Sequence, residues 1–476
     1  MFTVSPLHPE AVYRVRILYQ SGSHRGAIRL KKYNNVHGKQ AVPSIDFKIL
    51  QASTMSTTGN PSTKAKILRA AATLPVVTVC GLAAGFTAGI LLVALMSPWA
   101  PATRDFIFYW ATAQQLAHHA NPYDAAAIAT LERSAGLPVA YKAGFMRNPP
   151  WALPLIYPLG FLSARVGWIL WYFLLLACLA ASVYLLWILY GRPRNERYLL
   201  GLSFAPALVC IIYGQTSLLL LPGLVLFLRW QRTRPFLAGV ALSLCALKPH
   251  LFLPFGVVLL VWIAFERAAK LAAGVLAGLA FSCLLTFLID PSAWTQYAQM
   301  ARASGIENEP IPCVSYLLRA WISPQSIWLQ YLPALLGCAW AMAYYWPRRR
   351  NWDWPANGGL LLLVSLVAAP YSWIYDHGMV LPALLQSAFL ARSRNLLIAL
   401  AFLSALVEVA LICSLRYPPA LSLWTIWAAP AWLAWCLAAN APPGFWAKAR
   451  SVLLSIRFLR GREAAVGRGG ESDALE

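Results

Sequence analysis

Apolar runs of about 20 residues recur along the chain, and short polar segments separate them. The first run covers about 73–97 and the second about 166–190, and further runs continue to about residue 440. A helix of this length matches the hydrocarbon core of a bilayer and satisfies its own backbone hydrogen bonds there. The pattern predicts an all-α, polytopic transmembrane helical protein with about 12 spans.

The charged residues between the runs predict the orientation. Basic residues at 64–69 precede the first run, and later short loops carry basic clusters such as GRPRNER and RWQRTR. Positively charged loops stay on the cytoplasmic side of a membrane. We therefore expect a protein of the cytoplasmic membrane with both termini inside and its conspicuous polar residues at the outer face.

Two pairs of apolar runs are too short to cross a bilayer: about 199–213 with 216–229, and 235–247 with 250–265. As helices they rise only about 20–22 Å, against a hydrocarbon core of about 30 Å. The hairpin tips at Gln215 and Lys248 should then end below the outer surface, where irregular backbone is tolerated only beside a protein cavity. We expect both tips to line one.

The segment at about 98–165 follows the first run and is predicted to be a long external loop. It contains two amphipathic patterns, near 104–119 and 124–135, separated by the turn Asn121-Pro122-Tyr123. Aromatic amphipathic helices of this kind lie on the bilayer surface, which is where we expect these two.

Composition supports the membrane assignment. Hydrophobic residues make up 59% of the chain and charged residues 12%, whereas a soluble domain carries about 25% charged residues. The net charge of +22 comes mainly from basic loops and tails, so membrane lipid and an anionic lipid-linked substrate fit better than nucleic acid. The nine cysteines include no C-x-x-C pair and read as small buried residues.

Three regions follow from these patterns. Residues 1–72 form a cytoplasmic tail, of which 1–54 are polar and basic and precede Met55, a possible true start of translation. A disordered tail is the alternative for that segment. Residues 73–440 form the transmembrane domain, and 441–476 form a basic cytoplasmic tail.

Asp105 is the first candidate for chemistry, because it opens the aromatic segment outside the first span. A carboxylate facing a membrane cavity there would serve as a general base that takes the proton from a sugar hydroxyl. A salt bridge with Arg104 or an N-cap of the following helix is the structural alternative.

Cations form the second group of candidates. Lys248, between two short apolar runs, is costly unless it is paired or solvated, and we expect it to bind a phosphate. His250 would assist it or orient the turn, and Arg147 is a further phosphate or sugar contact. The alternatives are snorkelling of the lysine and a lipid-headgroup contact of the arginine.

Polar residues at the other tips complete the predicted site. Gln215 would bind sugar hydroxyls or phosphate, unless it is only a polar hairpin tip. Asp376 and His377 would line the sugar site, with an Asp376–Lys248 ion pair as the alternative for the acid. The chain has no H-E-x-x-H, D-x-D, P-loop or dinucleotide-binding motif, so we expect no metal and no cofactor.

Several short motifs in order resemble those of glycosyltransferase family 87. They are Asp105-Phe106, Asn121-Pro122-Tyr123, Asn148-Pro149-Pro150, Gly214-Gln215, Lys248-Pro249 and Pro370 followed by Tyr375-Asp376. The family comprises bacterial polyprenyl-phosphate-mannose-dependent α-mannosyltransferases of the GT-C class. The resemblance covers about 70–440.

The resemblance implies a GT-C-like fold and an inverting, metal-independent sugar transfer at the outer face. Asp105 would be the base, acting without a second acid beside it, since Asp124 caps the second loop helix. The donor would be a polyprenyl-phosphate sugar, most simply mannose, and the acceptor an envelope glycan or glycolipid. A secondary transporter or lipid-sugar flippase is the alternative, because broken helices and intramembrane charge also suit transport. A non-catalytic partner in envelope assembly is a third possibility.

Overall fold

The structure is a computed structural model, and it describes residues 105–139, 143–193, 195–303, 305, 309–391, 393–416 and 422–442, with a few earlier positions. The chain divides into two compact units, Met1–Ser62 and Thr63–Glu476. In the first unit β1 (Phe2–Val4) pairs antiparallel with β2 (Tyr13–Val15). The expected start at Met55 and nearly all of the predicted first span lie outside the described residues.

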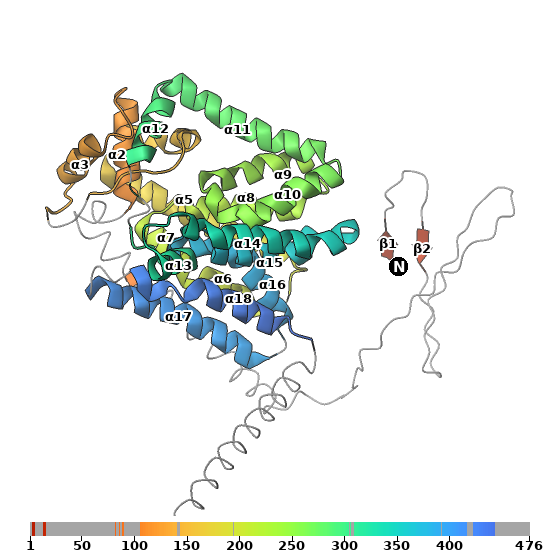
Figure 1. Cartoon of the computed structure of the whole chain (residues 1–476). Helices are drawn as coiled ribbons and strands as arrows, with labels where there is room; N and C mark the ends of the chain where they lie inside the picture. The colour runs from red at the N-terminus through yellow and green to blue at the C-terminus, as the bar shows by residue number, and fades with distance from the viewer. Residues whose placement is uncertain are drawn as a thin grey trace, which may run out of the picture. The chain divides into compact units, whose positions relative to one another are not determined.

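The described secondary structure of the second unit is helical throughout, as the sequence predicts (Figure 1). Its elements, in chain order, are α2 (Phe106–Ala117), α3 (Ala125–Ser134), η2 (Pro150–Ala152), α4 (Leu153–Ile156), η3 (Tyr157–Phe161), α5 (Ala164–Leu189), η4 (Glu196–Tyr198), α6 (Leu199–Leu202), α7 (Ala205–Tyr213), α8 (Ser217–Trp230), α9 (Pro235–Leu242), η5 (Ser243–Leu247), η6 (Pro249–Phe252), α10 (Leu253–Phe265), α11 (Ala269–Ile289), α12 (Ala293–Ala303), α13 (Val314–Ile322), α14 (Trp328–Tyr345), η8 (Trp346–Asn351), α15 (Trp354–Ala368), η9 (Ile374–Val380), α16 (Leu381–Leu390), α17 (Arg394–Arg416), η10 (Ser422–Thr425) and α18 (Ala428–Ala439).

Helices suited to a bilayer are fewer than predicted. Among the described residues four helical segments are long and apolar enough to cross a membrane, namely Ala164–Leu189, Glu196–Tyr213, Ala269–Ile289 and Arg394–Leu411. The bent pair Pro235–Leu247 and Pro249–Phe265 adds a fifth if it counts as one span. Several other apolar helices, such as α8 and α15, are shorter. The protein has several apolar helices compatible with membrane insertion, and the expected 12 spans are not confirmed.

Lys248 lies at a sharp break in the helical chain. The helical segments before and after it, Pro235–Leu247 and Pro249–Phe265, are bent by 118°. Pro249 at the start of the second segment has no backbone N–H, and it disfavours helical geometry for the preceding residue. Lys248 accordingly has φ −141° and ψ 67°. The lysine is thus presented at a tip, where the run lengths place it.

The first loop helix, α2, differs from expectation, because it is buried in the protein. Eight of its 12 residues are buried, including Phe106, Tyr109 and Trp110. The helix packs against η3 and α5, and a Cβ added at Gly160 of η3 would lie 2.2 Å from the carbonyl oxygen of Ala113. Because both faces of α2 are largely apolar, the helix is better accommodated inside the protein than on a bilayer surface.

Glycines bring α9 and α11 into backbone contact. A Cβ at Gly239 would lie 2.2 Å from the carbonyl oxygen of Leu271, and one at Gly274 would lie 2.0 Å from that of Phe236. Small residues at a helix interface allow close approach where lipid supplies no hydrophobic force between helices. This contact fixes the first half of the bent segment against a long apolar helix.

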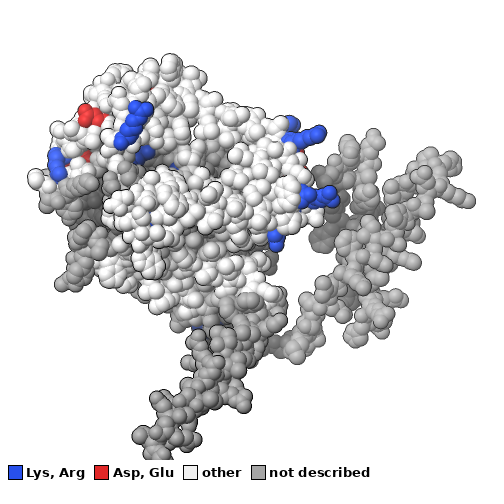
Figure 2. Space-filling view, viewed as in Figure 1, with Lys and Arg blue, Asp and Glu red and all other residues white. Residues whose placement is uncertain are grey.

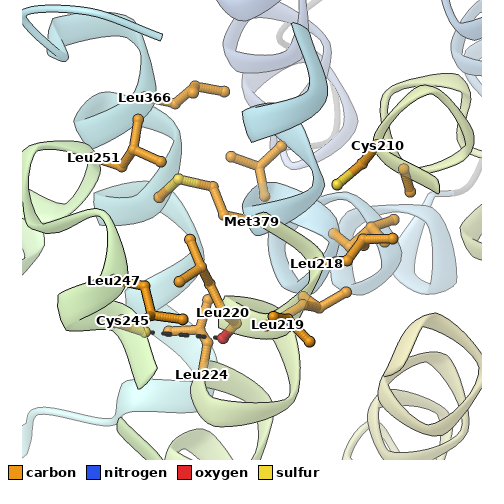
Figure 3. Packing of buried hydrophobic residues seen from close by; sticks show 14 of the residues in the cluster. Cys210, Leu218, Leu219, Leu220, Leu224, Cys245, Leu247, Leu251, Leu366 and Met379 are labelled. Atoms are coloured by element: carbon orange, nitrogen blue, oxygen red, sulfur yellow. Dashed lines mark hydrogen bonds between the residues drawn. The ribbon is translucent and has the colours of Figure 1, made fainter. Parts of the chain in front are cut away.

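An apolar core lies beneath the two tips. Leu218 and Leu220 of α8 pack with Leu247, Leu251 and Met379, as Figure 3 shows. These side chains come from α8, η5, η6 and η9, which carry or adjoin the predicted polar site residues. A close-packed interior resists displacement of its elements. The core therefore holds the polar tips in fixed relative positions.

Candidate active site

One cavity of about 540 Å³ collects five of the seven predicted site residues, which are Asp105, Arg147, Gln215, Lys248 and His250. Its wall also includes Phe145, Tyr371, Trp373 and Tyr375. This volume lies in the range of small-molecule sites, which combine apolar walls with a few placed polar groups. The structure thus brings residues from four distant parts of the chain to a single cavity.

Gly214 shapes the tip that carries Gln215. It ends α7 in the left-handed region with φ 72°, and its carbonyl oxygen accepts a 2.7 Å hydrogen bond from Trp171 Nε1. A Cβ at this position would lie 2.7 Å from Phe106 Cβ. Glycine meets both needs, because it tolerates positive φ and has no side chain to collide with α2.

The amide of Gln215 joins the acid to the cation. Its Nε2 donates to Asp105 Oδ2 at 2.7 Å, and its Oε1 accepts from Tyr109 Oη at 2.8 Å and from Lys248 Nζ at 3.4 Å. Two donors on the oxygen and a carboxylate on the nitrogen fix the orientation of the amide. Burial raises the pKa of Tyr109, so its phenol remains a donor.

Asp105 precedes the first residue of α2 and makes no side-chain capping bond to it. Its carboxylate faces the cavity and contacts Gln215, so the N-cap alternative does not describe its geometry. A half-buried carboxylate beside a cavity is placed to accept a proton from a bound hydroxyl.

Lys248 is buried, and its ammonium is held by three acceptors. Nζ donates to Asp376 Oδ1 at 2.7 Å, to Ser217 Oγ at 2.8 Å and to Gln215 Oε1 at 3.4 Å. It also lies 5.0 Å from the centroid of the Tyr375 ring. The contact to Gln215 is the longest of the three hydrogen bonds, so it is the one that a bound anion would most readily replace.

Asp376 forms the ion pair with Lys248 and does not line the cavity. It is completely buried, and its Oδ1 also accepts from Ser217 Oγ at 2.5 Å. Its Oδ2 accepts from the Trp373 backbone N–H at 2.9 Å. With both oxygens engaged and no exposed surface, Asp376 positions the lysine. The geometry gives no support to its predicted contact with sugar.

The two histidines differ. His250 lines the cavity and stacks on Tyr371, with ring centroids 3.8 Å apart. His377 does not line it, and its Nδ1 accepts a 3.1 Å hydrogen bond from Trp432 Nε1 of α18. His377 follows Asp376 directly, but the turn directs its ring into the helix packing, so its predicted place in the sugar site is not supported.

A comparison with known protein families identifies the domain that carries most of this cavity. A family model described as glycosyltransferase family 87 matches residues 145–370. These residues form a glycosyltransferase family 87 domain. No curated relative and no solved structure matches the chain. The predicted resemblance to this family is therefore confirmed over residues 145–370, and a domain of this family indicates a glycosyltransferase. Arg147, Gln215, Lys248 and His250 lie inside the matched range, whereas Asp105, Asp376 and His377 lie outside it.

Within this family 87 domain, Arg147 is already paired. Its Nη1 donates to Glu309 Oε2 at 3.0 Å and its Nη2 to Glu309 Oε1 at 2.5 Å, a two-pronged ion pair. Glu309 also lines the cavity. In the sequence Glu309 is only an acid in a polar loop. Folding brings it to Arg147, which lies 162 residues away in the chain. A phosphate that binds Arg147 must compete with this carboxylate.

Glu132 of α3 is a further acid that sequence reasoning missed. It is fully buried, and its Oε2 accepts a 3.1 Å hydrogen bond from the Gly144 backbone N–H. Burial is the main cause that raises the pKa of Glu132 to about 7; the Gly144 hydrogen bond and the charge of Arg133 oppose the rise, and the charge of Asp105 adds to it. Glu132 anchors the segment that carries Gly144, Phe145 and Arg147 into the cavity wall.

No group of three or more His, Cys, Asp or Glu side chains that could hold a metal ion occurs in the part of the chain that the structure describes. The cavity wall instead offers two cationic side chains, Arg147 and Lys248. Cationic side chains can stabilise negative charge on a departing phosphate.

Proposed function

We propose that this glycosyltransferase moves a sugar, most simply mannose, from a polyprenyl-phosphate donor to an envelope glycan or glycolipid at the outer face of the cytoplasmic membrane. The observation that supports it most directly is the Asp105–Gln215–Lys248 chain of hydrogen bonds beside one cavity. One amide holds a carboxylate on one side and an ammonium on the other.

The proposed reaction is a single inverting displacement. The acceptor hydroxyl oxygen bonds to the anomeric carbon as its proton passes to Asp105. The bond from that carbon to the phosphate oxygen breaks, and the electron pair leaves with the phosphate. Lys248 stabilises the charge that develops there, with its own position set by Asp376 and Ser217. No metal is needed in this scheme.

The test is transfer by membranes or purified protein with polyprenyl-phosphate-mannose as donor. Asp105→Asn keeps the side-chain size but removes the base, and we expect turnover to fall by about 10²–10⁴-fold. Asp124→Asn is the control in the same loop, because Asp124 only caps α3 through Ala126 and Ala127. Near-normal turnover of Asp105→Asn would contradict the mechanism.

The same assay addresses the sugar. Donors that carry mannose, glucose or arabinose on the same lipid phosphate should differ in kcat/KM if the cavity reads the hydroxyls. Equal use of all three would contradict the mannose assignment while leaving the reaction class intact. Transbilayer movement of the lipid without a glycosylated product would support a flippase instead.

A further inference from the structure

A second cavity, of about 980 Å³, lies at the opposite ends of the helices that form the active site. The helix α8 begins at Ser217, beside Lys248, and ends at Trp230, next to Gln231 in the wall of the second cavity. Fourteen helical residues span about 21 Å. The two cavities are therefore separate sites.

Basic side chains dominate this second cavity. Its wall carries four cations and two acids, which are Arg232, Arg267, Lys270, Arg350, Glu266 and Asp353. None of the four cations forms an ion pair with a carboxylate among the described residues. Figure 2 shows Lys and Arg side chains at this end of the molecule, where α11 begins and α14 ends. Three loops far apart in sequence thus combine into one positive concavity.

The start of α11 adds to the positive potential. Ala268 and Ala269 line the cavity at the N-terminus of this 21-residue helix. The N-cap residue makes no side-chain capping bond, and the first turn contains no acid. The helix dipole places partial positive charge at such an end, which favours an anion.

Arg267 is held in an unfavourable backbone conformation at this position. Its φ is 52°, in the left-handed region that glycine adopts more readily. Its carbonyl oxygen accepts a 2.7 Å hydrogen bond from the Ala269 N–H at the start of α11. Glycine would suit this backbone better, so the guanidinium is retained at a conformational cost.

Two buried polar atoms of the cavity wall are unused. Gln231 Oε1 and Trp352 Nε1 have no hydrogen-bond partner among the residues that the structure describes. Buried polar groups are normally satisfied, and these two atoms are available to bond to a molecule in the cavity. Phe236, Phe265 and Trp346, at the adjoining helix ends, are large and exposed. The positive cavity therefore adjoins apolar surface suited to acyl chains.

We propose that this basic cavity binds the phosphate headgroup of an anionic phospholipid at the membrane end opposite the active site. Arg267 and Lys270 contact the phosphate at the start of α11, and the exposed aromatic side chains contact the acyl chains. This binding is independent of the transfer reaction and uses none of its residues.

The test measures how tightly different lipids bind to the purified, delipidated full chain, with native mass spectrometry as the readout. Phosphatidylglycerol should bind more tightly than phosphatidylcholine, and Arg267→Gly with Lys270→Gln should weaken phosphatidylglycerol binding by about tenfold or more. The control is the double variant Arg234→Gln with Arg348→Gln. It removes the same number of positive charges from exposed residues at the same end that do not line the cavity.

The outcomes are distinct. Loss of binding in the Arg267/Lys270 variant, with little change in the Arg234/Arg348 variant, supports the site. An equal loss in both would show a diffuse charge effect and overturn it. Inorganic phosphate that binds as tightly as the lipid would overturn the lipid assignment. Arg267→Gly alone suits the local backbone, so its melting temperature should not fall while its lipid binding does.

Discussion

At the residue scale, Gln215 is the centre of the site. Asp105 and Lys248 bond to opposite ends of this one amide. Tyr109 supplies the second donor to the amide oxygen. A side-chain amide carries a donor and an acceptor in one fixed plane. This is why a glutamine can hold a base and a cation at once.

The buried ion pair makes a prediction about Asp376, which lies outside the cavity. Asp376→Asn should leave the Lys248 charge buried without its counter-ion, and we expect a loss of about 3–5 kcal/mol of stability. Because the lysine loses its anchor, KM for the donor should rise. Thermal or denaturant unfolding and steady-state kinetics measure the two effects.

The double variant Lys248→Met with Asp376→Asn is the matched control, because it removes both charges. It should recover most of the stability lost in the single variant while transfer stays impaired. If the double variant is no more stable than Asp376→Asn alone, the ion pair is not the reason for the destabilisation.

At the element scale, the turn between α7 and α8 determines where Gln215 lies. Gly214→Ala should destabilise the protein by about 1–3 kcal/mol, because φ of 72° and a Cβ 2.7 Å from Phe106 Cβ both oppose it. Transfer should fall with it, since Gln215 must shift. Gly256→Ala in α10 is the control: a Cβ there meets nothing within 4 Å, and alanine favours a helix. Equal stability of the two variants would contradict this account.

The buried contact between Glu132 of α3 and the cavity wall predicts that the stability of the fold depends on pH. The Glu132 pKa is raised to about 7 by burial, so its ionised form is disfavoured in the fold. The folded protein should therefore lose stability as pH rises from the ordinary value of 4.5 through about 7. Melting temperatures between pH 5 and pH 8 measure this.

Glu132→Gln should flatten that slope, because the amide cannot ionise. Glu196→Gln, an exposed acid of η4, serves as the control and should retain the wild-type slope. An unchanged slope in Glu132→Gln would show that another group titrates in this window.

At the scale of the whole molecule, the two cavities at opposite helix ends predict how the protein is oriented in the membrane. The active site adjoins the tips at Gln215 and Lys248, and the basic cavity adjoins the loops that the positive-inside rule assigns to the cytoplasm. A reporter fused after Pro193 should therefore be active inside, and one fused after Ser323 outside. Both reporters on the same side would contradict the topology.

The sequence by itself determined the helical class, the order of apolar runs and the positions of the tips, because hydropathy and helix-breaking residues act locally. It also singled out Asp105, Gln215 and Lys248, since a polar group next to a short apolar run stands out. The Asp124 cap of α3 was predicted for the same local reason.

Only the tertiary structure decided how these residues act together. It paired Asp376 with Lys248, directed His377 toward Trp432, and joined Arg147 to Glu309. It buried α2, where the amphipathic pattern predicts a surface helix. Each outcome depends on contacts between segments far apart in the chain, and the local pattern of a sequence does not encode which distant partner a side chain will meet.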